Sequence, residues 1–369
     1  MLGICLKGSL KIGGGNLTVT GLVYHPTYLK HDTGWGHPER PERISRTVLA
    51  LKKKGLLDNP KIKVLTPEPA DIEDLASVHS KEYLEKIRLV SISGGALTPD
   101  TPLTPDTFEI ARLSAGGAIH AGKAVAENDV RNSFALIRPP GHHAGRDYGG
   151  GFCYFNNVAV MIEYLKKNFG MRRFMVIDWD VHHGNGTQDI FYKDPSVLYF
   201  STHQMPLYPG TGHITEIGEG EGRGYTVNLP LPAGTPGDVY DQIIEELIVP
   251  LAEEFMPEMI VASAGFDAYY GDPIANLQFT IQTYINITSR LIELTDRVCK
   301  GRLTMILEGG YDLEAVPKII TEVVSTLAGL GNYEIEDSHL PIERGKIRIV
   351  EDRIRKLKTI LSDYWKTLR

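Results

Sequence analysis

Two carboxylates and two imidazoles lie within six residues of this sequence, in the segment 178–183. They follow an apolar run at 174–177, which predicts a buried strand. Side chains alternate between the faces of a strand, so we expect Asp178, Asp180 and His182 to project to one side. Burying three such groups without a purpose would be costly, and the pattern therefore indicates a metal site. For a lone Asp-x-His, capping of the next helix or pairing with a basic residue is the alternative.

Three further polar motifs follow apolar runs that also predict strands. The motifs are 138–144, which contains His142 and His143, then 263–267 and 307–311. The runs before them are 134–137, 259–262 and 303–306. In an open parallel α/β sheet, ligands bind beyond the carboxyl ends of the strands, so all four motifs should converge on one crevice. Strand-like runs alternate with helical patterns along the chain, which favours one α/β unit.

Apolar residues at helical spacing predict helices between these strands. The expected helices are 107–126, 157–168, 238–255, 280–299, 314–330 and 347–368. We expect Asp106 and Asp238 to be N-caps. The last helix has one apolar stripe with basic residues opposite, which indicates docking on the fold or contact in a homo-oligomer.

Together the motifs resemble those of the histone deacetylase superfamily. The residues of these motifs resemble those of class II and its prokaryotic acetoin-utilisation and acetylpolyamine amidohydrolase relatives more closely than those of class I. The resemblance spans about 24–331 and rests on seven ordered segments: 37–43, 138–144, 150–157, 178–188, 208–212, 265–267 and 308–311. It implies a single-domain, three-layer arginase/deacetylase-like α/β fold with a central, mostly parallel sheet flanked by helices.

The resemblance also implies a metal-dependent site. Asp180, His182 and Asp267 match three zinc ligands, and Asp178 matches a carboxylate that orients a tandem histidine and contributes to a structural potassium site. Three protein ligands leave coordination positions open, as catalysis requires. Iron(II) or cobalt(II) would also fit this oxygen-rich set. A bound divalent metal can lower the pKa of its water from 15.7 to about 7 and polarise a carbonyl.

The other reaction groups are matched in the same way. His142 and His143 match a proton-transfer pair, and Tyr311 matches the phenol that holds the substrate carbonyl. Loss of one oxyanion donor typically costs on the order of 100- to 1,000-fold in rate. Asn185 stands where class I enzymes carry a second Asp that partners His143. No Gly-x-Ser-x-Gly elbow is present, and Cys153 is interpreted as a packed wall residue rather than a nucleophile.

Further positions match a tunnel for an acylated lysine. Phe152 matches one wall, Tyr208 stands at the opposite wall where the family usually has Phe, and Gly151 matches a backbone acceptor for the substrate amide. Gly310, in the turn before the phenol, is grouped with these substrate-binding residues. Asp100 resembles a rim aspartate that holds the substrate backbone, with a turn-capping role as the alternative.

Two residues bear on product release and substrate choice. Arg43 resembles an arginine lining a cavity beneath the metal, where acetate leaves, with a surface arginine as the alternative. Polyamine-selective relatives carry a glutamate where this chain has Ile274, which disfavours acetylpolyamines. The main hypothesis is therefore zinc-dependent hydrolysis of N-acyl-lysine amides in proteins or peptides. A small-molecule amidohydrolase acting on acetylated amines is the second, and a non-catalytic acyl-lysine binding module is the third.

The composition agrees with an intracellular enzyme. Three cysteines without paired spacing imply no disulfide framework, as in a reducing compartment. No apolar run approaches 18 residues, so we expect no membrane span and a cytoplasmic location. The net charge of −7 argues against general nucleic-acid affinity and suits cationic substrates. We expect a leader at 1–20, a catalytic domain at 21–335 and a C-terminal segment at 336–369 whose helix packs on that domain.

Overall fold

An eight-stranded sheet forms the centre of the computed structural model, which describes residues 19–331 and 344–369. Its strands are β1 Thr20–Val23, β2 Ile62–Leu65, β5 Asn132–Ala135, β6 Phe174–Asp178, β7 Val197–Gln204, β8 Thr226–Leu231, β9 Met259–Ala264 and β10 Leu303–Leu307. They lie in the order β2-β1-β5-β10-β9-β6-β7-β8, and every neighbouring pair is parallel. A separate antiparallel pair joins β3 Gly95–Ala96 to β4 Pro102–Leu103.

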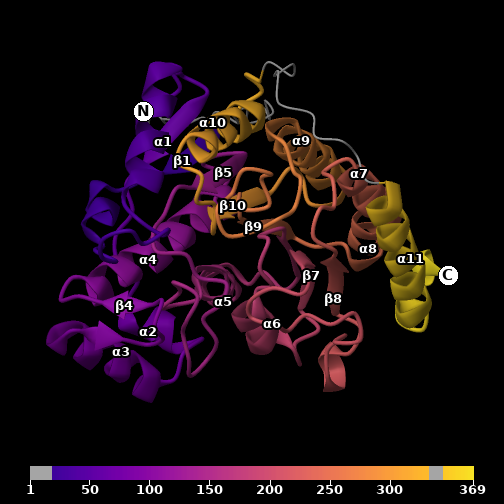
Figure 1. The fold of residues 1–369 in the computed structure, drawn as a ribbon, viewed down its shortest axis with the longest axis horizontal. Helices are drawn as coiled ribbons and strands as arrows, with labels where there is room; N and C mark the ends of the chain where they lie inside the picture. Colours follow the sequence, from indigo (N-terminus) through magenta and orange to yellow (C-terminus); the bar gives the residue numbers. More distant parts are fainter. Residues whose placement is uncertain (1–18, 332–343) are drawn as a thin grey trace, which may run out of the picture.

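Helices cover both faces of the large sheet. The α-helices are α1 Glu42–Lys53, α2 Ile72–Ala76, α3 Lys81–Ser93, α4 Thr107–Ala126, α5 Asn157–Phe169, α6 Asn185–Phe191, α7 Val239–Ile243, α8 Val249–Phe255, α9 Ile281–Val298, α10 Ala315–Leu327 and α11 Arg344–Leu361. Four short turns of 3-10 or π type are Pro26–Lys30, Gly220–Gly222, Ile244–Ile248 and Lys366–Leu368. In Figure 1, α4, α5 and α6 lie on one side of the sheet, and α1, α9, α10 and α11 lie on the other. The three-layer α/β fold expected from the sequence is thus confirmed.

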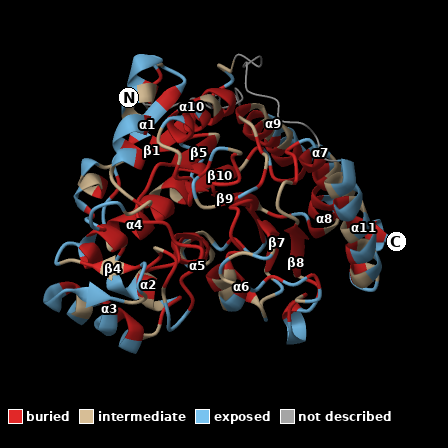
Figure 2. Ribbon diagram, viewed as in Figure 1, coloured by how far each residue is buried: buried red, intermediate tan, exposed pale blue. Residues whose placement is uncertain are grey.

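Alternate strand residues pack into two hydrophobic cores. In β6, Met175 and Ile177 belong to one core, whereas Phe174 and Val176 belong to the other. This period of two is that of a strand buried on both faces. Figure 2 shows buried residues throughout the sheet and along the helix faces turned toward it. With both faces covered, the polar side chains of the site gather beyond the carboxyl ends of the strands.

The C-terminal helix α11 packs beside β8 and α7 (Figure 1). Its apolar stripe, Val350, Ile354, Leu357 and Leu361, is buried against the main core. None of the described helices is long and apolar enough to span a membrane. The expected leader lies outside the described residues up to position 18, and β1 already begins at Thr20. The expected junction at 335/336 also lies outside the described residues.

Four local predictions differ from the structure. The helix expected at 347–368 ends at Leu361, and Lys366–Leu368 forms a separate 3-10 turn. The strand expected at 134–137 begins and ends two residues earlier, because its neighbour β1 ends at Val23, the partner of Ala135. The helix expected at 238–255 is interrupted by a π turn just before Pro250, a residue that has no N–H to donate. Asp106 and Asp238 occupy the expected N-cap positions, but they have helical backbone angles and their side chains make no cap bond.

Candidate metal centre and active site

Three side chains converge beyond the carboxyl ends of β6 and β9. Asp180 and His182 follow β6, and Asp267 follows β9, the strand that pairs with β6. One ligand atom from each lies within 4.8 Å of the other two, and all three residues are buried. His182 Nδ1 lies 3.2 Å from both Asp180 Oδ1 and Asp267 Oδ2. The fold therefore brings the three expected ligands together.

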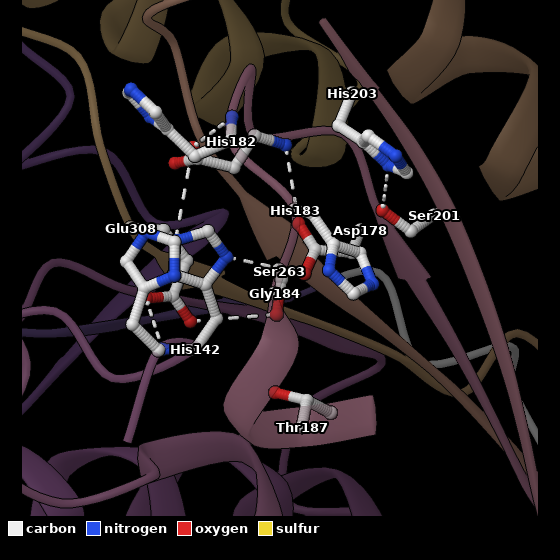
Figure 3. A network of polar contacts seen from close by, with 12 residues as sticks. His142, Asp178, His182, His183, Gly184, Thr187, Ser201, His203, Ser263 and Glu308 are labelled. Carbon is white, nitrogen blue, oxygen red and sulfur yellow. Dashed lines mark hydrogen bonds and ion pairs between the residues drawn. The ribbon is translucent and has the colours of Figure 1, made fainter. Parts of the chain in front are cut away.

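Asp178 stands apart from this cluster. β6 ends at Asp178, so Asp180 and His182 occupy the following loop, and the expectation that all three project from one side of a strand was wrong. The backbone turns there because Asp178 Oδ1 accepts the N–H of Asp180 at 3.2 Å. Asp178 Oδ2 instead faces His142 Nδ1 at 3.2 Å (Figure 3). The same oxygen accepts the Tyr199 hydroxyl at 3.0 Å. Asp178 thus orients an imidazole.

The donor set of the cluster fits a divalent cation. Val181 N donates to Asp267 Oδ1 at 2.9 Å and Gly309 N donates to Asp180 Oδ2 at 2.8 Å, which leaves the other oxygen of each carboxylate facing His182. Burial, followed by the charge of Asp180, raises the pKa of Asp267 to about 6. Burial lowers the pKa of His182, but the two carboxylates outweigh it and raise that pKa to about 10. Two carboxylates around one imidazole suit zinc, iron(II) or cobalt(II), any of which would take the place of the imidazole proton.

The tandem histidines have opposite surroundings. His142 faces Asp178, and its Nε2 lies 3.8 Å from Asp180 Oδ1. Burial lowers the pKa of His142, but these two carboxylates outweigh it and raise the pKa to about 10. His143 Nδ1 lies 2.8 Å from Asn185 Oδ1, which belongs to a neutral amide. Burial, together with the neighbouring histidines, holds the pKa of His143 well below its usual value. The surroundings therefore raise the pKa of one imidazole of the pair and lower that of the other.

A pocket of about 250 Å³ opens over the cluster. The predicted residues that line it are Asp100, His143, Gly151, Phe152, His182, Tyr208, Ile274 and Tyr311. The Phe152 ring lies edge-on to Tyr311 at 5.7 Å, and the Tyr208 ring lies edge-on to His143 at 5.0 Å. At Gly151, where φ is +53°, a Cβ would fall 2.5 Å from the His143 ring, so only glycine fits. The pocket therefore has aromatic walls and reaches the three-residue cluster through His182.

Arg43 and Gly310 lie behind this pocket. Arg43 is buried, so the surface alternative for it was wrong. Its Nε donates to Gly310 O at 2.6 Å, and its guanidinium lies 4.9 Å from the centre of the Tyr311 ring. Gly310 does not line the pocket. Its carbonyl oxygen instead accepts the hydrogen bond from Arg43. Asp100 lines the pocket and also accepts hydrogen bonds within its own turn, including one from Thr101 Oγ1 at 3.1 Å.

Comparison with known proteins identifies the family. The sequence-family model of the histone deacetylase domain matches residues 37–327 of this chain. The chain belongs to the histone deacetylase family. It is 43% identical to a probable deacetylase from Archaeoglobus fulgidus, over 95% of this chain and 100% of that protein. It is 35% identical to the polyamine deacetylase HDAC10 of Homo sapiens, over 95% of this chain and 53% of that protein. The crystal structure of the HDA15 HD domain matches with a TM-score of 0.85 at 31% identity, covering 95% of this chain and 96% of that one.

Sequence reasoning missed three buried acids around this deacetylase-family site. Glu308 Oε2 accepts the backbone N–H groups of 141–142 at 2.7 and 3.1 Å, which anchors the tandem histidines (Figure 3). Asp272 Oδ2 accepts the N–H of Tyr311 at 2.7 Å. Glu39 pairs with two buried arginines. Each acid lies inside or beside one of the seven motifs. Because an acid among glycines and prolines is also typical of a turn, the sequence alone did not predict its role.

Proposed function

We propose that this chain hydrolyses the amide bond of N-acylated lysine side chains in proteins or peptides, with zinc as its metal. The observation that carries the proposal is an aromatic-walled pocket that reaches the cluster of candidate metal ligands and exposes one of the tandem histidines and a phenol. The cluster is Asp180, His182 and Asp267, of which His182 lines the pocket together with His143 and Tyr311. A pocket of this kind admits a linear side chain and places its amide at the cluster.

Asp180, His182 and Asp267 would hold the metal. When bound, a divalent metal activates water as a nucleophile and polarises the amide carbonyl. Zinc, iron(II) and cobalt(II) all match the donor set, so the zinc assignment predicts which metal restores activity to stripped protein. The potassium ion that the resemblance implies beside Asp178 also stays a prediction.

The remaining groups divide the proton and charge work. His143, held neutral, takes a proton at its second ring nitrogen and returns it to the departing amine. His142, held by Asp178, stays protonated and supplies positive charge to the reacting centre. Tyr311 donates its hydroxyl to the developing oxyanion. Burial raises the pKa of Tyr311 well above its usual value, so the phenol keeps the proton that it must donate.

Hydrolysis of a small acetylated amine is the second candidate, supported by the similarity to a polyamine deacetylase. Ile274 favours the peptide over the polyamine, because it places an apolar side chain at the pocket where a cation would need a carboxylate. A non-catalytic acyl-lysine binder is the third candidate. The complete set of His142, His143 and Tyr311 argues against it, because binding alone requires no proton-transfer pair.

Steady-state acetate release from an acetyl-lysine peptide and from N-acetylputrescine, measured side by side, tests the proposal. Each substrate is run on zinc-loaded and on chelator-stripped protein, and we expect zinc-dependent turnover of the peptide. Preference for N-acetylputrescine would move the function to small-molecule amides, and peptide binding without turnover would favour the binding module. Tyr311→Phe is expected to lower kcat by roughly 100- to 1,000-fold with the metal content unchanged. A wild-type rate in that variant would contradict the role given to Tyr311.

A further inference from the structure

His143 begins a chain of four polar side chains that runs from the pocket to the protein surface. His143 Nδ1 lies 2.8 Å from Asn185 Oδ1, and Asn185 Nδ2 lies 3.2 Å from the Tyr148 hydroxyl oxygen. The Tyr148 hydroxyl in turn hydrogen-bonds to Asp189 Oδ2. Asn185 and Asp189 lie one turn apart on α6, so they share a face of that helix. Tyr148 is 38% exposed and Asp189 is exposed, so the chain ends in solvent.

The carboxylate of Asp189 sets the direction of every hydrogen bond in this chain. An ionised carboxylate only accepts, so the single hydroxyl proton of Tyr148 goes to Asp189. The Tyr148 oxygen must then accept from the NH₂ group of Asn185, and the Asn185 amide presents its carbonyl oxygen to His143. Since a carbonyl oxygen has no proton to give, Nδ1 of His143 must carry one.

We infer that Tyr148 and Asp189 are positioning residues that hold a proton on Nδ1 of His143 and so leave the Nε2 lone pair for the substrate. Asn185 needs such partners because its amide can present either a carbonyl acceptor or an NH₂ donor to His143. Turned by 180°, it would offer NH₂ to Nδ1 and leave the proton on Nε2, where it blocks proton uptake. A carboxylate at position 185, as in class I relatives, could only accept. The effect on rate rests on the proposed function, in which His143 moves the proton.

The local backbone holds the phenol in place. Gly145 N donates to Tyr148 O at 3.0 Å and closes a turn beside the tandem histidines. A Cβ at Gly145 would fall 2.4 Å from the Tyr148 ring, so the ring packs directly on the glycine. Burial, followed by the hydrogen bond to Asp189, raises the pKa of Tyr148 above its usual value, so the phenol keeps its proton as a donor.

Two variants should break the hydrogen-bond chain, and a third, conservative variant should keep it. Tyr148→Phe removes the acceptor for the Asn185 NH₂ group, and Asp189→Asn removes the group that fixes the phenol proton. Each should lower kcat for an acetyl-lysine peptide by roughly 10- to 100-fold with KM unchanged, which is part of the 10²- to 10⁴-fold that proton transfer contributes. Asp189→Glu should recover most of the rate. Tyr192→Phe, just past the same helix and not connected to His143, is the matched control and should keep the wild-type kcat.

The tautomer itself is read from the ¹⁵N shifts of the imidazole nitrogens in zinc-loaded protein, with His143→Ala to assign the signals. Wild type should show protonated Nδ1 and unprotonated Nε2 in His143, and both variants should add a population with protonated Nε2. Unchanged tautomers in both variants would overturn the inference, whether or not kcat falls, because a merely structural disturbance would not move the proton. If wild type hydrolyses no acyl amide, the proposed function fails, and the tautomer populations alone decide the inference.

Discussion

Glu39 holds together a buried charge cluster beneath the site. Its Oε1 lies 3.0 Å from Arg43 Nη1 and 2.7 Å from Arg138 Nε, and all three residues are buried. Arg43 in turn lies under the Tyr311 ring. Removing one carboxylate would therefore leave two buried guanidinium groups without their counter-charge. Breaking a buried ion pair in this way typically costs about 3–5 kcal/mol.

The pKa of Glu39 gives an independent magnitude. Burial alone would raise this pKa, but Arg138 and Arg43 outweigh it and lower the pKa from 4.5 to about 2. Because the folded pKa is the lower one, the stabilisation is complete above pH 4.5 and is lost as the pH falls toward 2. At about 1.4 kcal/mol per pKa unit, the difference amounts to about 3 kcal/mol at pH 7. The same linkage leaves about 1 kcal/mol at pH 3.

Glu39→Gln, which has the shape of the protonated acid, should therefore lower the free energy of unfolding by about 3 kcal/mol at pH 7 and by about 1 kcal/mol at pH 3. The loss shrinks because the wild-type carboxylate itself becomes protonated in acid. Urea denaturation of both proteins at the two pH values measures the difference. Glu42→Gln removes the same charge from an exposed position on α1 and should show no comparable loss. An equal loss at both pH values, or none at pH 7, would refute the reasoning.

Three further outcomes are expected. Trp35→Ala should lower kcat/KM for acetyl-lysine peptides about two- to tenfold and leave kcat/KM for N-acetylputrescine unchanged. The reason is that the fully exposed indole lies two residues from His37, whose ring packs on Phe152 in the pocket wall, where only a peptide would reach it. An equal effect on both substrates would contradict a contact with the peptide. Ile274→Glu should raise kcat/KM for N-acetylputrescine relative to the peptide, by up to about fivefold, because a carboxylate at the pocket would attract the free ammonium; an unchanged ratio would count against that position. Leu357→Ala should lower the free energy of unfolding by about 2–5 kcal/mol in urea denaturation, because this side chain of α11 is fully buried in the main core. Lys356→Ala, at an exposed position of the same helix, should show no such loss.

The site could be located from the sequence because its signals are local. An apolar run followed by polar residues marks the end of a strand, and the carboxyl ends of parallel strands meet at one edge. Asp180 and Asp267 lie far apart in the chain and are brought together because β6 pairs with β9. The strand order itself could not be predicted, because neither apolar run contains a signal for which strand will lie beside it. For the same reason the end of β5 was misplaced, because it depends on where β1 ends.

Roles that depend on distant partners were open or unseen in the sequence. The resemblance placed Arg43 inside the fold, and its burial agrees. The residue pattern alone left a surface position open, because helical periodicity does not say that Glu39 and Arg138 close over it. Tyr148 and Asp189 are exposed polar residues of a loop and a helix, which is the ordinary state of both types. Their importance emerges only when the fold places them in line with Asn185. Periodicity in a sequence predicts burial and exposure, whereas hydrogen-bond chains require coordinates.

The tandem histidines show why their neighbours decide the chemistry. Adjacent imidazoles disfavour each other's protonation, so one proton charge is shared between two identical side chains unless the surroundings separate them. His142 faces Asp178, which together with Asp180 raises its pKa to about 10, whereas His143 faces the neutral amide of Asn185 and its pKa falls well below the usual value. Environments that push two pKa values apart assign the acid and base roles. On the proposed function, those roles would depend on the partners, a carboxylate for one ring and an oriented amide for the other. The hydrogen bonds that orient the amide would then matter to the reaction as much as the imidazoles do.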